Sequence, residues 1–398
     1  MTGDTVPRYP TLRPGPFDPP AELAELRRWE PISRMEYPDG HVGWVVTSHH
    51  LARSMLSDPR FSARSEFKRP PVSRPGADPF YGAPALPGWL VDMDPPEHTR
   101  LRQQLAGRFT ARRMREMRPE VDQIVGRLLS DMERHGPPVD LVQHFALPLP
   151  SQLISALLGV PYRERAEFQR HSETLFSLQA TAAEAAAAMA ELYALVRELT
   201  KQDRGQHRGL LATLTEEGTL DAEEIAGVGV LLLTAGHEST SKSLALSVFA
   251  LLSHPDQLAK LTATPTLIDN AVEELLRYLT VFHFGVPRTP LEDVWFGGRL
   301  LRAGESITVS LPAANRDPGW FGAAADRLDI ERRTTGHMAF GYGIHQCLGQ
   351  NLVRTELRAA LPALFRRFPE LRVAVDPGEV PLSTDMSVYG VQRLPVAW

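Results

Sequence analysis

Cysteine is almost absent from this chain of 398 residues, which contains Cys347 and no other. One thiol cannot form an internal disulfide, and it cannot supply a metal site made of four cysteines. A lone cysteine most often packs as a small buried hydrophobic residue. Any more specialised role for Cys347 therefore has to be argued from its neighbours in the sequence.

Lysine and long apolar runs are also scarce. The lysines are Lys68, Lys201, Lys242 and Lys260. Arginine carries nearly all the positive charge, and the formal net charge of −5 does not point to a nucleic-acid partner. The strongest apolar run, residues 225–235, is about half as long as the ~20 residues of a membrane-spanning helix, and residues 1–20 contain no apolar secretion signal. We expect a soluble, cytoplasmic, monomeric protein without a membrane anchor.

The pattern of apolar residues predicts a mainly α-helical protein with small β-sheets, built as one unit over residues 1–398. Hydrophobic residues make up 43% of the chain, enough for a sizeable core, and no linker divides it. Residues 1–20 are rich in proline and are expected to form an extended lead-in. Residues 64–90 are predicted to form a long irregular loop, and loops of that length are uncommon unless they are functional.

Helical periodicity extends from about residue 96 to residue 261. The longest helix is predicted over residues 221–252, because Asp221 and the acidic residues after it form a typical helix start. At 1.5 Å per residue this helix would be roughly 48 Å long and would cross the whole protein. Further helices are predicted over 119–133 and 181–200, a hairpin over 34–47, and strands within 285–309 and 373–398.

Cys347 lies in the segment Phe340-Gly341-Tyr342-Gly343-Ile344-His345-Gln346-Cys347-Leu348-Gly349-Gln350. Its glycines allow the backbone to turn tightly and to approach something flat and bulky. One soft ligand at the centre of so open a segment suits a thiolate bound to haem iron. The alternative is a buried thiol in a glycine turn, which these neighbours disfavour.

Two further patterns place polar groups together on predicted helices. Glu274 and Arg277 are three residues apart and share a helix face, although taken alone they are more simply a surface ion pair worth well under about 1 kcal/mol. His98 and Arg102 are four residues apart behind a helix-starting proline pair, so they would project together as two donors to one carboxylate.

Arg288 and His345 add two more cationic or donor groups. The two propionates of a buried haem need such partners. Each of these four residues, taken alone, is more often a solvated surface group, so their combination is what favours a haem site.

The predicted long helix has an apolar run that polar residues interrupt at Thr234-Ala235-Gly236-His237-Glu238-Ser239-Thr240. Ala235 and Gly236 have almost no side-chain bulk, which would let a flat group lie against the helix. Glu238 and Ser239, or Thr240, place an acid and a hydroxyl beside this gap. Helical hydroxyls often bond to a carbonyl one turn earlier and can admit water. The alternative is a packing notch beside a solvated Glu238.

These elements together resemble the cytochrome P450 family of haem-thiolate enzymes, along essentially the whole chain and in the same order. The residues that match the haem-binding loop are Phe340, Gly341, Gly343, His345, Cys347 and Gly349. The propionate donors of the family correspond to His98, Arg102, Arg288 and His345. Glu274 and Arg277 match a helix pair that the family completes with an upstream arginine, here Arg332 or Arg327. Ala235 to Thr240 matches the oxygen-binding groove.

The resemblance implies a haem-thiolate monooxygenase with haem b and O₂. Such an enzyme inserts one oxygen atom into a hydrophobic small molecule, by hydroxylation or epoxidation, in natural-product tailoring or xenobiotic oxidation. Electrons would come from NAD(P)H through a ferredoxin reductase and a ferredoxin. Cys347 would be the proximal ligand, and Glu238 with Ser239 or Thr240 would relay protons. The family usually has threonine where this chain has Ser239, so the hydroxyl is retained while its rotamer is less restrained.

The resemblance also indicates where substrate and ferredoxin would bind. The loop 78–91 is expected to wall the pocket. The expected pocket residues are Leu90, Val91, Leu232, Ala235, Val281, Phe284, Met386 and Val388. Four arginines would face an acidic ferredoxin on the cysteine side, although a solvated helix face explains them equally well: Arg112, Arg113, Arg115 and Arg118.

Other functions remain open on the same scaffold. A peroxide-driven peroxygenase or a haem reductase fed directly by NAD(P)H would share the fold, and a haem sensor or carrier would need no proton relay. Peroxide-driven relatives lack the acid–alcohol pair, whereas Glu238 and Ser239 are both present here. The monooxygenase is therefore the favoured interpretation.

Overall fold

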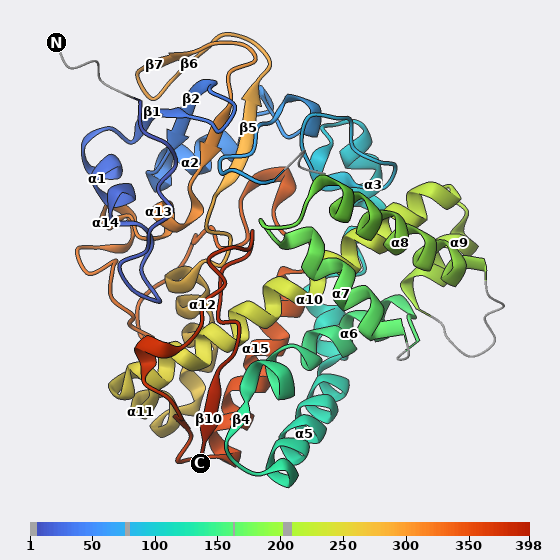
Figure 1. Cartoon of the computed structure of the whole chain (residues 1–398), viewed down its shortest axis with the longest axis vertical. Helices are drawn as coiled ribbons and strands as arrows, with labels where there is room; N and C mark the ends of the chain where they lie inside the picture. The colour runs from blue at the N-terminus through green and yellow to red at the C-terminus, as the bar shows by residue number, and fades with distance from the viewer. Residues whose placement is uncertain (1–5, 76–79, 162–163, 202–208) are drawn as a thin grey trace.

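The computed structural model describes residues 6–75, 80–161, 164–201 and 209–398, and it is mainly helical with small sheets at opposite ends (Figure 1). The helices are α1 Ala21–Trp29, α2 His49–Ser57, α3 Glu97–Ala106, α4 Ala111–Glu116, α5 Arg118–His135, α6 Pro148–Leu158, α7 Arg165–Phe176, α8 Ala182–Lys201, α9 Leu210–Glu217, α10 Ala222–Ser253, α11 Pro255–Ala263, α12 Ile268–Leu279, α13 Leu311–Asn315, α14 Pro318–Phe321 and α15 Gln350–Arg367. The strands are β1 Ile32–Glu36, β2 Val42–Val46, β3 Phe61–Ser62, β4 Val139–Asp140, β5 Val286–Pro290, β6 Val294–Phe296, β7 Arg299–Leu301, β8 Ile307–Val309, β9 Arg372–Val373 and β10 Pro395–Ala397. The predicted fold class is confirmed.

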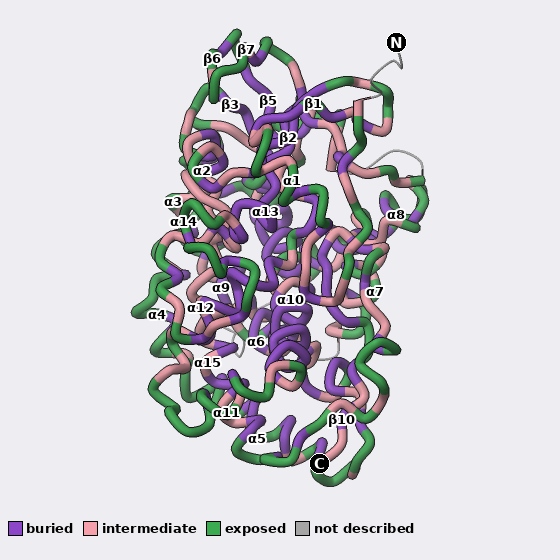
Figure 2. The backbone as a smooth tube through the Cα atoms, turned by 90° about the vertical axis from the view of Figure 1, so that its left-hand side faces the viewer, coloured by how far each residue is buried: buried purple, intermediate pink, exposed green. Residues whose placement is uncertain are grey.

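Helix α10 is the central element, and it is buried along nearly its whole length (Figure 2). Its 32 residues begin one residue after the predicted start and end one residue beyond the predicted end. Asp221 caps it by accepting a hydrogen bond from the Glu224 amide at 2.8 Å, and the Glu224 carboxylate accepts one from the Asp221 amide at 3.1 Å. The prediction of a long central helix is confirmed, and both neighbouring helix predictions, α5 and α8, are confirmed as well.

The main sheet has the strand order β1-β2-β8-β5-β3. Strands β1 and β2 form the predicted antiparallel hairpin, in which Ile32 pairs with Val46, and β2 pairs with β8 in parallel. Strands β6 and β7 form a second hairpin around Gly297 and Gly298, as expected for the region 285–309. These strands lie together at the end of the molecule away from α5 and α11 (Figure 1).

The C-terminal region contains less strand than the sequence predicts. Between β9 and β10 the chain contains a short turn of helix at Pro377–Glu379 and isolated antiparallel bridges from Leu382 to Val391 and from Met386 to Ser177. Pro377 and Pro381 lack the amide donor that a strand ladder needs, so pairing cannot extend through them. The result is a loop over residues 382–391 that is closed by the bridge between Leu382 and Val391.

The predicted loop 64–90 is largely irregular, with a short turn of helix at Ser65–Phe67 and another at Leu90–Asp92 where the loop ends. Residues 76–79 of this loop, and residues 1–5 of the proline-rich lead-in, lie outside the described residues. Among the helices that the structure describes, none combines the length and the apolar character that crossing a membrane requires.

Candidate functional site

A cavity of about 460 Å³ lies between α10 and the segment that carries Cys347. From α10 it is bounded by Leu231, Leu232, Thr234, Ala235, Gly236, Ser239, Thr240, Ser243 and Ser247. On the other side it is bounded by Phe340, Gly341, Tyr342, His345, Cys347, Leu348 and Gly349. Most of the lining is apolar, and a volume of this size is typical of small-molecule sites.

The Cys347 loop is held by its own backbone. The Cys347 amide donates to the carbonyl oxygen of Phe340 at 2.9 Å, which closes the loop just before α15 begins at Gln350. Gly343 has a φ of 76°, and a Cβ there would lie 2.1 Å from the carbonyl oxygen of Leu56, so no other residue fits without a shift.

The Cys347 thiol combines burial with backbone donors. Burial raises its pKa, while the amides of Gly349 and Gln350, which hydrogen-bond to the sulfur, lower it together with nearby Arg102 and Arg354. Amide donors of this kind stabilise a thiolate and tune a metal bound to it. No group of three or more histidine, cysteine or acidic side chains that could hold a metal ion occurs in the described part of the chain, so a metal here would depend on Cys347.

A cluster of basic side chains lies at one edge of the cavity. The rings of His98 and His345 lie 4.2 Å apart, Arg102 donates to the carbonyl oxygen of Gln346, and Arg288 is buried. Both ring nitrogens of His98 and Nε2 of His345 are buried without a hydrogen-bond partner among the described residues. Arg102, Arg288 and His345 line the cavity, whereas His98 lies behind His345.

Burial is the main cause of the pKa shifts in this cluster, and neighbouring positive charges add to it at His345. Burial, followed by Arg288 and His98, lowers the pKa of His345 to about 2, and burial lowers the pKa of Arg288 to about 10. A dianion at this edge would relieve both effects, because it would supply the missing acceptors and neutralise the charge.

Lys68 belongs to the same cluster, and the sequence analysis missed it. It is buried, lines the cavity, forms an ion pair with Asp92, and its charge helps to lower the pKa of His345. Asp92 also accepts a hydrogen bond from Trp89 Nε1 at 2.9 Å. The only hint in the sequence is that lysine is rare, which does not distinguish Lys68 from the exposed Lys201.

The polar residues of α10 divide between two faces. Ser239 Oγ donates to the carbonyl oxygen of Ala235 at 3.0 Å, Thr240 Oγ1 to that of Gly236 at 3.3 Å, and both hydroxyls line the cavity. Glu238 does not line the cavity and instead forms an ion pair with Lys242. Glu238 therefore lies on a different face of α10 from the hydroxyls of Ser239 and Thr240, with which it was predicted to act.

Gly236 lines the cavity as predicted. However, a side chain at this position would collide with Ile154 of α6, and this contact explains the need for glycine. A Cβ at this position would lie 2.9 Å from Cγ1 of Ile154 on α6. Ala235, by contrast, is exposed to the cavity and does leave α10 flat there.

Of the predicted pocket residues, Leu90, Val91, Leu232, Ala235, Val281, Phe284 and Val388 line the cavity. The prediction for Met386 is wrong, because this residue does not line the cavity. Its carbonyl oxygen lies 2.8 Å from His283 Nε2, and the neighbouring Ser387 lines the cavity instead. Residues 78 and 79 of the predicted wall lie outside the described residues. The predicted loop contributes the aromatic residues Phe80, Tyr81 and Trp89, and Phe176, which the prediction did not include, lines the cavity as well.

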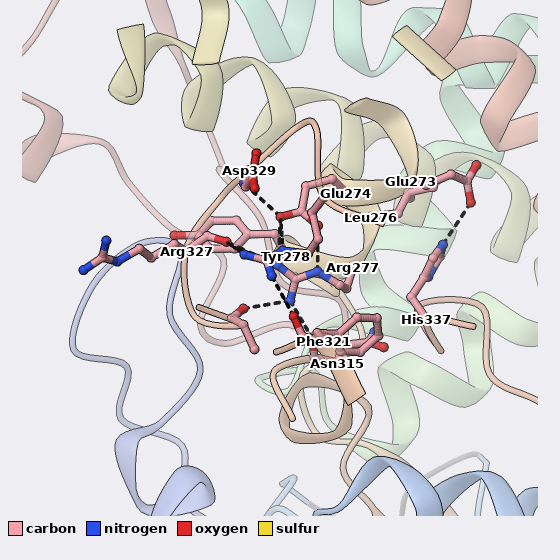
Figure 3. A network of polar contacts seen from close by, with 12 residues as sticks. Glu273, Glu274, Leu276, Arg277, Tyr278, Asn315, Phe321, Arg327, Asp329 and His337 are labelled. Carbon is pink, nitrogen blue, oxygen red and sulfur yellow. Dashed lines mark hydrogen bonds and ion pairs between the residues drawn. The ribbon is translucent and has the colours of Figure 1, made fainter. Parts of the chain in front are cut away.

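Glu274 and Arg277 form a completely buried ion pair (Figure 3). Arg277 Nε lies 2.7 Å from Glu274 Oε2, and Arg277 Nη2 lies 2.9 Å from Oε1. Arg332 adds a contact from its Nε to Glu274 Oε1 at 3.3 Å. Arg327 contributes only its carbonyl oxygen, because its guanidinium points away from the network. Of the two arginines that the sequence left open, Arg332 is the one in contact with Glu274.

Comparison with known proteins assigns the family. The sequence model of the cytochrome P450 family matches residues 265–395. Cytochrome P450-SU2 of Streptomyces griseolus is 46% identical, with 99% of this chain and 97% of the relative covered. The chain is a cytochrome P450. The 20-oxo-5-O-mycaminosyltylactone 23-monooxygenase of Streptomyces fradiae is 40% identical over 98% of this P450 and 92% of that relative.

The fold agrees with solved P450 structures. The crystal structure of CYP105P1 in complex with filipin I matches with a TM-score of 0.91 and 38% identity, covering 99% of both chains. The resemblance inferred from the sequence motifs is thus confirmed, and this P450 is a haem-dependent monooxygenase that acts on small molecules.

The residues at the cavity fit the haem of a P450. A thiol with two backbone donors is available to hold the iron, and buried histidine nitrogens without partners lie in a region of excess positive charge that would suit two propionates. Ala235 leaves the opposite wall flat. These features are independent of one another, and each matches a different part of the group.

We predict that Cys347→Ala will abolish the strongly red-shifted absorption band of the reduced CO complex, which is diagnostic of thiolate ligation. The matched control is Ile344→Ala, since Ile344 is exposed in the same loop. Absorption spectra of both purified variants, reduced under CO, provide the measurement. Survival of the band in Cys347→Ala would mean that another residue ligates the iron.

We predict that Arg332→Ala will lower the free energy of unfolding by about 3 kcal/mol, because it leaves the buried Glu274 carboxylate short of a cation. It also removes hydrogen bonds from Arg332 to the carbonyl oxygens of Phe321 and Ala324. Arg327→Ala should cost less than about 0.5 kcal/mol, since that side chain is exposed. Urea denaturation followed by circular dichroism measures both variants; equal losses would contradict the assignment.

Proposed function

We propose that this P450 oxidises a medium or large hydrophobic substrate, by hydroxylation or epoxidation, with electrons from NAD(P)H delivered by a ferredoxin reductase and a ferredoxin. The observation that carries the proposal is the largely apolar cavity between α10 and the Cys347 loop. Relatives named for the oxidation of a mycaminosyl tylactone and for the synthesis of pentalenic acid support natural-product tailoring. Oxidation of xenobiotics is the other use that we consider.

In this proposal the Cys347 thiolate would hold the haem iron, and the amides of Gly349 and Gln350 would stabilise its charge. His98, Arg102, Arg288 and His345 bind the propionates, and Lys68 adds a further positive charge at that edge. Bound haem supplies oxygen activation, which electron donation by the thiolate favours. The protein contributes the orientation of the substrate and the exclusion of bulk water.

Proton delivery is assigned to α10. The hydroxyls of Ser239 and Thr240 line the cavity and are oriented by carbonyl oxygens one turn earlier. Each can pass a proton into the cavity while receiving another from water. Glu238 is the buried acid nearest to them in sequence and serves as their proton source.

The ferredoxin is proposed to bind near α4, on the side of Cys347. Asn351, at the start of α15, donates to the carbonyl oxygen of Phe109 at 2.9 Å, which fixes the α4 region close to the cysteine loop. Arg112, Arg113 and Arg118 form ion pairs within their own helices, with Glu116 or Asp122. Exposed pairs of this kind are weak, so the guanidinium groups remain available to an acidic partner.

We also propose that the enzyme functions as a cytoplasmic monomer and that residues 1–398 form one domain. The support is that residues from both ends of the chain, Phe17 and Val396, belong to one hydrophobic cluster, in which Phe17 packs against Phe249 of α10. No partner subunit is needed to complete the cavity walls described above.

Turnover with NADPH, a ferredoxin reductase and a ferredoxin tests the proposed function. We expect product from a hydrophobic substrate, first selected by its spin-state spectral shift, without added peroxide. Product that forms only with peroxide would establish a peroxygenase instead. Reduction by NADPH without the ferredoxin would establish a directly fed reductase, and haem binding without turnover of any selected substrate would favour a sensor or carrier.

We predict that Arg112→Glu combined with Arg113→Glu will lower kcat/KM for ferredoxin about tenfold at low salt, through loss of electrostatic steering. The effect should shrink as ionic strength rises, because salt screens exposed charges. Arg299→Glu is the control, since Arg299 is equally part of an exposed ion pair but lies on the β6–β7 hairpin at the top of Figure 2, away from α4. Equal effects of the two changes would contradict a docking site at α4.

A further inference from the structure

Two charged residues of α10 lie side by side on a face that the cavity does not reach. Glu238 and Lys242 are one helical turn apart, and neither lines the cavity, whereas Ser239 and Ser243 directly after them do. The side chains of Glu238 and Lys242 are 9% and 11% exposed. A buried acid beside a proton-delivery face, paired in this way, calls for a functional explanation.

Lys242 is held by two hydrogen bonds and an ion pair. Its Nζ donates to Ser383 Oγ at 2.8 Å and to the carbonyl oxygen of Val391 at 3.4 Å. It also lies 3.6 Å from Glu238 Oε1. Lys242 is therefore fixed in position, and its charge is fixed beside the Glu238 carboxylate.

The anchor of Lys242 is the loop 382–391, which also forms part of the cavity wall. Ser387 and Val388 line the cavity from the same loop whose Ser383 and Val391 hold the ammonium group. The stem of Lys242 packs against Gly390, where a Cβ would lie 2.7 Å from Lys242 Cβ. The loop thus connects the substrate cavity to the cation that pairs with Glu238.

We propose that Lys242 is a positioning residue for proton delivery, which holds the Glu238 side chain off the cavity face and ties it to the cavity-wall loop. The proposal rests on the role of Glu238 as proton source given above. Without Lys242 the buried Glu238 side chain would lose its ion-pair partner and its tie to the loop, so it would leave its present position.

The other titratable group beside Glu238 does not replace Lys242. His237 is fully buried, burial lowers its pKa, and its Nδ1 lies 2.8 Å from the carbonyl oxygen of Leu233. Its ring packs edge-on against Phe168 of α7. A neutral imidazole in this setting supplies no charge to hold the carboxylate.

The readout follows from the balance of protons and electrons. A productive turnover consumes O₂, two electrons and two protons and yields one oxygenated product and one water. If proton delivery is misdirected, the two electrons and two protons instead reduce O₂ to hydrogen peroxide, which is released without oxygenated product. Misplacement of Glu238 therefore lowers product per NADPH and raises peroxide, while haem and substrate binding are unaffected.

The test uses the haem-loaded enzyme with the reductase, ferredoxin and substrate of the function assay. We expect Lys242→Met to lower product per NADPH about tenfold, the low end of what loss of such a supporting contact costs, with peroxide rising in compensation. Lys242→Arg, which keeps the charge, should restore most of the coupling. Lys260→Met is the matched control, because Lys260 pairs with Glu331 on the surface. The solvent isotope effect on product formation should rise in Lys242→Met and stay unchanged in the control.

Comparison with Glu238→Gln separates this inference from the proposed function. If Lys242 acts through Glu238, the double variant Glu238→Gln, Lys242→Met will be no less coupled than Glu238→Gln alone. Additive losses, or normal coupling in Lys242→Met while Glu238→Gln uncouples, overturn the role of Lys242 alone. Normal coupling in Glu238→Gln overturns the proton relay itself. Should Lys242→Met fail to take up haem, Lys242→Gln, which keeps a donor for Ser383 without the charge, decides on the same criteria.

Discussion

The position of the Cys347 loop depends on a buried ion pair that the loop does not touch. Arg277 is neutralised by Glu274 and donates to the carbonyl oxygen of Asn315 at 2.7 Å. Asn315 in turn accepts from the Met338 amide at 2.7 Å, and Met338 accepts from the Gly341 amide at 3.0 Å. Because a broken buried pair leaves an uncompensated charge, this chain of bonds has strong reason to stay intact. This series of hydrogen bonds fixes the backbone at Gly341, in the loop that carries Cys347, relative to the buried ion pair.

Local signals account for what the sequence could predict. The cap at Asp221 marks the start of α10, the glycines around Cys347 mark a tight turn, and the hairpin turn at Gly40 sets β1 against β2. Each signal spans a few neighbouring residues, so no tertiary information is required. The grouping of His98, Arg102, Arg288 and His345 at one site was also predicted, although this prediction relied on resemblance to a family.

What could not be predicted depends on partners far apart in the chain. Choosing Arg332 over Arg327 needs the path of the backbone from Asn315 to Asp329, since both arginines lie at a plausible separation from Glu274. Lys242 donates a hydrogen bond to Ser383, which is 141 residues away in the sequence. The residues next to Lys242 in the sequence therefore do not indicate that its side chain is buried. The prediction for Met386 is wrong for a related reason. In an irregular loop the side chains do not alternate between two faces as in a strand, and the neighbouring Ser387 and Val388 line the cavity.

The arrangement of α10 resolves a conflict within the cavity. A hydrophobic substrate favours an apolar, dry wall, whereas proton delivery needs polar groups and charge, which are costly to bury without partners. The cavity face therefore carries small hydroxyls that satisfy themselves on the helix backbone, as Ser239 and Thr240 do. The charged residues lie on the adjacent face, where Glu238 pairs with Lys242 and Ser383 of the loop 382–391 holds Lys242. A single helix thus presents hydroxyls to the substrate and keeps its acid on the adjacent face, one residue away.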